Sequence, residues 1–145
     1  STNPGESLKP LSQVASGGEL SRIMLAIKTV LAGRDEIDTL IFDEIDTGIS
    51  GRTAWKVAEQ LSVLSGAHQV ICITHLPQIA AMADVHFVIE KSSTDDMTIT
   101  DIRNVADEES LAELARLLGS DALTEAALSN AKEMKEQANA FKETR

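Results

Sequence analysis

The stretch TLIFDE, residues 39–44, decides the fold of this chain. It places a short, uninterrupted apolar run directly before two acids. A continuous apolar run is typical of a parallel strand covered on both faces, whereas a strand with one wet face alternates apolar and polar residues. We therefore predict a strand over residues 39–42, buried on both faces, with two carboxylates at its carboxyl end.

A second apolar run, VICIT at residues 70–74, is followed by His75. Between the two runs lies a helical pattern that Ser50 can cap and that Gly66 can end. A helix that joins two such strands predicts that they are parallel neighbours in one sheet. Because ligands bind beyond the carboxyl ends of parallel strands, we expect the acid pair and His75 at one site.

A strongly amphipathic helical pattern precedes the acids and runs from Gly18 to Gly33. The sequence Ser16-Gly17-Gly18-Glu19 stands at its start. Two glycines leave backbone N–H groups accessible, the helix start carries a positive partial charge, and Ser16 adds a hydroxyl donor. The motif therefore predicts an anion or phosphate cradle; a plain helix N-cap on a Gly-rich turn is the alternative.

The rest of the chain predicts further short elements. We expect a loop over the first sixteen residues, a helix over 77–82, a hairpin of strands 85–90 and 97–105 with a loop at 92–96, and helices over 107–118 and from about 121 to the end. The fold class is therefore α/β: a mainly parallel sheet flanked by helices, followed by a hairpin and terminal helices, in one domain over residues 1–145.

The terminal helix carries small and apolar residues at alternating spacings of four and three: Ala127, Ala131, Met134, Ala138 and Phe141. This spacing is also that of a coiled coil. The run is short and mostly alanine, so a helix packed on its own domain is favoured over the root of a coiled coil.

The acid pair suits the hydrolysis of a nucleotide. Successive strand residues point to opposite faces, so Asp43 and Glu44 have different tasks. Asp43 can hold Mg²⁺ and Glu44 can polarise an attacking water, while His75 can reach a phosphate. The alternatives are two solvated acids and a surface histidine. Cys72 lies in an apolar run and is therefore expected in the core. A metal site formed with His75 would need further ligands at suitable spacing, and none are present in the sequence.

Composition excludes several classes of protein. The 145 residues carry 13 Lys and Arg against 23 Asp and Glu, a net charge of −10, and no basic stripe emerges. Such a chain is a poor binder of DNA or anionic membrane by itself. No apolar run approaches the roughly 20 residues needed to span a bilayer. A single cysteine and the absence of a signal-peptide pattern lead us to expect a cytoplasmic location.

The order and spacing of the motifs resemble those of ABC-type ATPases. Ser16-Gly17-Gly18-Glu19 resembles their signature motif, in the SGGE form of SMC-like proteins. Residues 40–44 resemble the Walker B strand, Asp46-Thr47-Gly48 resembles the D-loop, and His75 resembles the switch histidine. Together they most resemble the C-terminal lobe of the ATPase head in bacterial SMC-like DNA-repair proteins.

The resemblance implies a role for each motif. Asp43 would organise Mg²⁺, Glu44 would be the general base, and His75 would sense the γ-phosphate of ATP. The signature residues 16–19 would clamp the γ-phosphate of a nucleotide bound to a second head, and Asp46 would lie at that interface. ATP would join two heads into a homodimer, and hydrolysis would release them.

One expected motif is missing, because no G-x-x-x-x-G-K-[ST] phosphate loop occurs in the chain. In the resembled family this Walker A loop lies in an N-terminal lobe beyond a long coiled coil. We therefore expect the chain to need that lobe as a partner. DNA contact in double-strand-break repair or recombination, and any association with the nucleoid, would come through the full-length protein.

Three other functions compete with this one. A nucleotide-binding domain of an ABC transporter usually has Pro after the catalytic Glu and Gln at the end of the signature, where this chain has Ile45 and Glu19. A DExD-type helicase fits residues 43–46 but not the upstream Ser-Gly-Gly helix start. A non-enzymatic interaction domain with relic motifs is the third.

Overall fold

The computed structural model describes residues 10–31, 34, 36–94, 97–119 and 123–144. The chain divides into two compact units, Ser1–His75 and Leu76–Arg145. The expectation of one domain over residues 1–145 stays a prediction. Among the described helices, none has both the length and the apolarity needed to cross a membrane.

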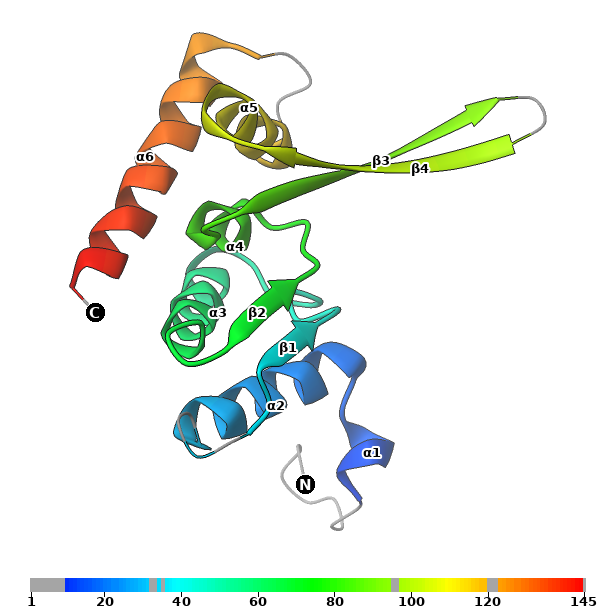
Figure 1. Cartoon of the computed structure of the whole chain (residues 1–145), viewed down its shortest axis with the longest axis vertical. Coiled ribbons are helices and arrows are strands. Elements are labelled where there is room, and N and C mark those ends of the chain that lie inside the picture. Colours follow the sequence, from blue (N-terminus) through cyan, green and yellow to red (C-terminus); the bar gives the residue numbers. More distant parts are fainter. Residues whose placement is uncertain (1–9, 32–33, 35, 95–96, 120–122, 145) are drawn as a thin grey trace. The chain divides into compact units, whose positions relative to one another are not determined.

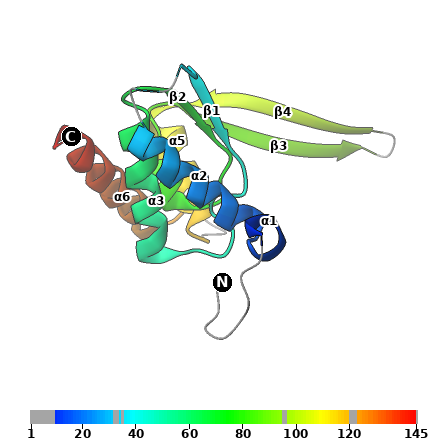
Figure 2. The same cartoon turned by 90° about the horizontal axis from the view of Figure 1, so that it is seen from below.

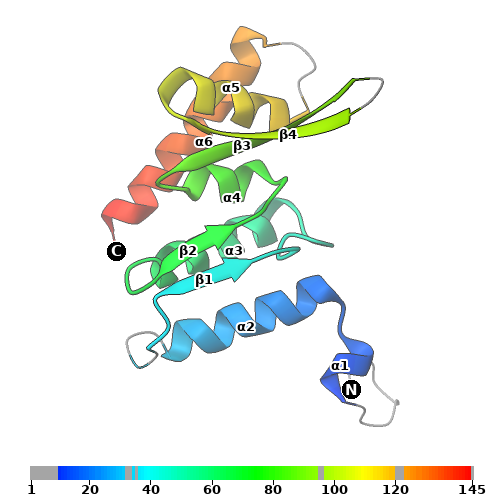
Figure 3. The ribbon, with the colours of Figure 1, turned by 45° about the vertical axis from the view of Figure 1, so that its right-hand side comes forward.

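Among its described residues, the first unit holds two parallel strands and three helices (Figure 1). Its elements are α1 (Leu11–Val14), α2 (Gly17–Leu31), β1 (Thr39–Phe42), α3 (Gly51–Leu64) and β2 (Gln69–Cys72). The strands pair in parallel, in a register that runs from Thr39 opposite Gln69 to Phe42 opposite Cys72 (Figure 3). Helices α2 and α3 pack against each other (Figure 2). The predicted strand–helix–strand unit is confirmed.

The prediction that β1 is buried on both faces is wrong. Phe42 is 6% exposed, but its neighbour Ile41 is 68% exposed. Ile71 and Ile73 in and after β2 are exposed as well. The physical reason is that no described element of this unit covers that face of its two-stranded sheet. An apolar run predicts that both faces of a strand are buried, but it does not identify the segment that packs on each face.

The described part of the second unit is a hairpin with three helices: α4 (Pro77–Met82), β3 (His86–Thr94), β4 (Met97–Val105), α5 (Asp107–Leu117) and α6 (Glu125–Glu143). The antiparallel strands pair from His86 opposite Val105 outward, as predicted, although β3 continues through Thr94 into the expected loop. Helix α6 packs on α4 and α5. It buries four of the spaced residues, Ala127, Ala131, Met134 and Ala138, so the packed-helix interpretation is confirmed.

Two helix starts differ from the predictions. A short helix, α1, follows Pro10 where a loop was expected; a proline before a helix is acceptable because the first helical N–H groups lack partners anyway. Ala106, not Asp107, is the N-cap residue of α5. Helix α6 begins after Thr124, whose side chain accepts a hydrogen bond from Ala127 N–H at 3.2 Å. Its expected start near residue 121 lies outside the described residues.

Candidate functional site

The signature-like motif forms a capping box at the start of α2. The Glu19 carboxylate accepts hydrogen bonds from the Ser16 N–H at 2.8 Å and the Ser16 hydroxyl at 3.0 Å. The Ser16 oxygen in turn accepts the Glu19 N–H at 3.3 Å. The bond from the Ser16 backbone lowers the pKa of Glu19 below its usual value. The N-cap interpretation therefore describes the local structure, and the phosphate cradle stays a prediction.

The two acids follow β1 in a sharp turn that we call the acid loop, residues 43–47. Both carboxyl side chains are exposed. The Asp43 carboxylate accepts the Glu44 N–H at 2.8 Å, and the Thr47 N–H donates to the Glu44 carbonyl at 3.0 Å. Glu44 has φ +56°, a left-handed conformation that costs a side-chain residue on the order of 1 kcal/mol. The turn thus holds Glu44 in a strained backbone position at the strand end.

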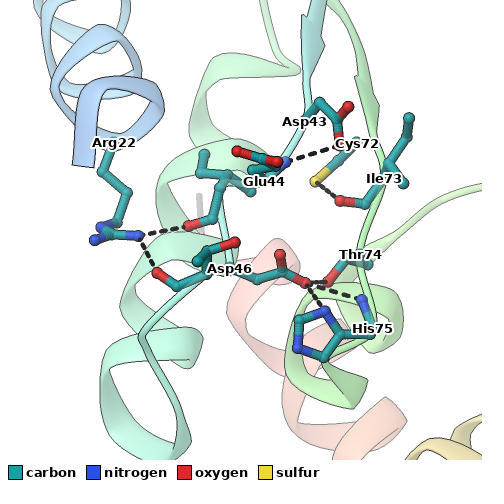
Figure 4. Close-up of polar contacts among 10 residues, drawn as sticks. Arg22, Asp43, Glu44, Asp46, Cys72, Ile73, Thr74 and His75 are labelled. Carbon is teal, nitrogen blue, oxygen red and sulfur yellow. Dashed lines mark hydrogen bonds and ion pairs between the residues drawn. The ribbon is translucent and has the colours of Figure 1, made fainter. Parts of the chain in front are cut away.

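Asp46 points inward and holds the end of the second strand (Figure 4). Its side chain is almost fully buried. One carboxylate oxygen accepts the Thr74 hydroxyl at 2.6 Å and the His75 N–H at 2.9 Å, and it lies 3.0 Å from His75 Nδ1. The His75 side chain is 73% exposed, so Asp46 orients the ring while most of it stays accessible.

The structure therefore joins the predicted residues of both strand ends within the first unit. Asp46 lies between the acid pair and His75 in this arrangement. Within this chain, the Asp46 carboxylate bonds to Thr74 and His75. The expectation that Asp46 also lies at an interface between two heads stays a prediction.

Two residues missed by the sequence analysis connect α2 to the acid loop. The Ser21 hydroxyl donates to the Asp43 carbonyl at 3.0 Å. Arg22 Nη1 donates to the carbonyl oxygens of Ile45 at 3.0 Å and Thr47 at 2.9 Å. Ser21 and Arg22 stand three and four residues after Gly18, on the same helix face, and this spacing was the signal available in the sequence.

The donor set fits a magnesium ion brought with a nucleotide. Among the described residues, no three His, Cys, Asp or Glu side chains gather into a metal site. Mg²⁺ in nucleotide sites is commonly held by one or two carboxylates together with water and phosphate oxygens. The exposed Asp43 carboxylate is an oxygen donor of this kind, and its role as a magnesium ligand stays a prediction.

Cys72 is half-buried rather than in the core as expected, but its surroundings disfavour the reactive thiolate. Burial, with smaller contributions from the negative charges of Asp46 and Asp43, raises the pKa of the Cys72 thiol to about 12. The thiolate is the nucleophile, so we expect maleimide to label the folded chain far more slowly at pH 8 than the urea-unfolded chain. Timed labelling followed by mass spectrometry measures both rates.

The same pKa of Cys72 sets a pH dependence. The folded chain keeps this thiol protonated, while an unfolded thiol ionises near its usual pKa of 9.0. The contribution of the protonated thiol to the free energy of unfolding is fully present below pH 9.0. It is lost as the pH rises toward about 12. Rapid labelling of the folded chain at pH 8 would contradict the burial of Cys72.

The chain is similar to bacterial DNA repair proteins. It is 48% identical over 142 residues to DNA repair protein RecN of Halalkalibacterium halodurans. The matched stretch is 98% of this chain and 25% of that protein. It is 48% identical to RecN of Bacillus subtilis over 144 residues, 99% of this chain and 25% of the relative.

RecN of Treponema pallidum is 52% identical over 134 residues, 92% of this chain and 23% of the relative. The chain thus spans about a quarter of the length of the curated relatives it matches. No family model matches it.

Proposed function

Because this chain belongs to the RecN family over nearly its whole length, we propose that it is the C-terminal lobe of an SMC-like, ABC-type ATPase head in a DNA repair protein. In this proposal ATP joins two heads into a homodimer and hydrolysis releases them. The complete protein is then an ATPase, while this lobe alone is nearly inactive.

The observation that carries the proposal is the contact between the signature-like helix start and the acid pair. A Cβ atom placed on Gly17 would lie 2.5 Å from a carboxylate oxygen of Glu44. Gly17 therefore lies against the side chain of the proposed general base. The two motifs that the proposal assigns to ATP hydrolysis, one toward the partner head's nucleotide and one toward its own, therefore lie in contact within the first unit.

In this proposal the strand-end residues take the roles that the family's motifs imply. Asp43 would hold Mg²⁺, and the ion would supply charge stabilisation for the phosphates. Glu44 takes a proton from the attacking water, and the exposed His75 ring, oriented by Asp46, contacts the γ-phosphate. The buried carboxylate of Asp46 accepts from Nδ1–H of the ring, and in the imidazolium form Nε2–H can donate to a phosphate oxygen.

The start of α2 acts on a second head. Ser16, Gly17 and Gly18 clamp the γ-phosphate of the nucleotide bound by the partner head. Glu19 keeps the helix start in shape through the capping box, and its carboxylate must yield the Ser16 donors when the phosphate arrives.

The remaining partners lie outside this chain. The exposed apolar face formed by Ile41, Ile71 and Ile73 supports a partner that completes the sheet, and we assign it to the N-terminal Walker A lobe. A net charge of −10 supports placing DNA contact elsewhere in the full-length protein. The protein would act in the cytoplasm, at the DNA of the nucleoid.

The isolated chain tests this proposal. We expect it to bind MgATP weakly and to turn ATP over at least about 100-fold more slowly than the complete head, because nothing in its sequence supplies the phosphate loop that positions the nucleotide. Calorimetric titration and phosphate release measure both properties.

Mixing the chain with the remaining part of a RecN protein is the matched experiment. Restored turnover, with loss of solvent exposure at the Ile41 face in hydrogen exchange, is the expected result. Turnover by the chain alone at the rate of the complete head would contradict the proposed division of the site.

A further inference from the structure

We propose that Arg22 is a positioning residue that fixes the acid loop to α2, so that the signature-like helix start and the acid loop move as one body during ATP hydrolysis. This inference rests on the proposed function. In the proposed function the start of α2 contacts the nucleotide of the partner head, and the acid loop acts on the nucleotide of its own head. Arg22 would couple these two parts of the first unit.

Side chains of α2 bond to alternate carbonyl oxygens along the acid loop. Ser21 donates to the Asp43 carbonyl at 3.0 Å. A single nitrogen of Arg22 donates to the carbonyl oxygens of Ile45 at 3.0 Å and Thr47 at 2.9 Å (Figure 4). Arg22 thereby bonds to the backbone on both sides of the buried Asp46. Hydrogen bonds from a guanidinium are charge-assisted and therefore stronger than those between neutral groups.

Close packing adds a second constraint at the same place. A Cβ atom on Gly18 would lie 2.8 Å from the Glu44 carbonyl oxygen, and 3.0 Å from both the Thr47 carbonyl oxygen and Arg22 Nη1. The helix backbone therefore lies directly on the acid loop. Hydrogen bonds and contact together leave little room for one to slide past the other.

The connection continues to the switch-like histidine. Arg22 holds the carbonyls that flank Asp46, and Asp46 holds Thr74 and both a ring and a backbone nitrogen of His75. Moving α2 relative to β1 would therefore disturb the orientation of His75. Such a chain of specific bonds is a physical route by which the signature end and the catalytic end of one head respond together.

The guanidinium also suits the local charge. Asp43, Glu44 and Asp46 place three carboxylates within four residues, and no lysine follows them in the acid loop. Arg22 brings a positive charge beside that loop from a distant part of the chain. It partly offsets the repulsion among the acids before Mg²⁺ arrives.

The test is Arg22→Ala in the complete RecN-family protein that contains this segment. Loss of the fixed register should slow the chemical step while ATP binding, which depends on the other lobe, is kept. We expect kcat to fall about tenfold, the effect of losing bonds to a charged group, with KM changed by less than about twofold.

Two further variants sharpen the result. Arg22→Lys should recover most of kcat, because one nitrogen makes both bonds and a lysine ammonium offers three donors. Ser21→Ala removes the neighbouring bond and should lower kcat less than Arg22→Ala does. It replaces Arg22→Ala as the test of the inference if that variant does not fold. Arg116→Ala is the matched control, since Arg116 is exposed and pairs with Glu113 on its own helix.

The outcomes separate the inference from the proposed function. If Arg22→Ala, Arg22→Lys and Ser21→Ala all turn over like the native protein while Glu44→Gln stalls, the inference is wrong and the proposed function stands. Equal losses in kcat, ATP affinity and melting temperature, without rescue by Lys, would reduce Arg22 to a fold-stabilising residue and also overturn it. If Glu44→Gln leaves turnover unchanged, both fall.

Discussion

Replacing Glu44 with Gln in the complete protein is expected to slow ATP turnover by about 10²- to 10⁴-fold, the contribution of a general base. The amide keeps the size of the side chain but cannot accept a proton from water. Binding of MgATP should persist, because Asp43 and the other lobe supply it. Steady-state phosphate release and single-turnover kinetics measure the loss.

The oligomeric state distinguishes this result from a folding defect. With hydrolysis stalled, ATP-dependent dimers of the Glu44→Gln variant should accumulate, as seen by light scattering. Glu143→Gln, an isosteric change at an exposed position near the end of α6, is the control and should behave as the native protein. Native turnover in Glu44→Gln would remove Glu44 from the mechanism and favour a non-enzymatic interaction domain.

Gly18→Ala is expected to destabilise the chain and to abolish turnover in the complete protein. The added methyl group would lie 2.8 Å from the Glu44 carbonyl oxygen and 3.0 Å from that of Thr47. Both are backbone atoms that cannot rotate away, so α2 and the acid loop must separate. Overpacking of this kind costs about 1–3 kcal/mol of unfolding free energy. Urea denaturation of the 145-residue chain measures it.

Gly17→Ala is the matched control for stability. Its methyl group would lie 2.5 Å from a carboxylate oxygen of Glu44, the end of a flexible side chain that can turn away. We expect its unfolding free energy to stay within about 0.5 kcal/mol of the native value, while turnover falls because Glu44 is displaced. Equal denaturation midpoints for Gly17→Ala and Gly18→Ala would show that α2 does not lie on the acid loop as described.

Much of the local structure was predictable. The apolar run at 39–42 gave the bounds of β1, and Pro77 with its following residues gave those of α4. These elements depend on interactions between residues close in sequence, such as periodicity, caps and turn residues. The extra turn at Leu11–Val14 and the N-cap at Ala106 were missed because single helix ends depend on small energy differences.

The sequence named the residues of the candidate site but not the connections between them. Asp43, Glu44 and His75 were named from residue type and from their positions after apolar runs. The hydrogen bonds of Arg22 to the acid loop join residues 23 and 25 positions apart, and the bonds of Asp46 to Thr74 and His75 join residues 28 and 29 apart. No local pattern specifies such partners.

The sequence by itself predicted most of the elements and that the first two strands are parallel, and it named the side chains proposed to carry acid, base and phosphate-binding chemistry. Only the tertiary structure decided that Asp46 turns inward to His75, that Arg22 joins α2 to the acid loop, and that the face of Ile41 stays exposed. The physical reason is the separation in sequence over which each kind of interaction acts. Periodicity and capping act over a few residues, whereas burial and buried hydrogen bonds depend on what distant segments bring to the same place.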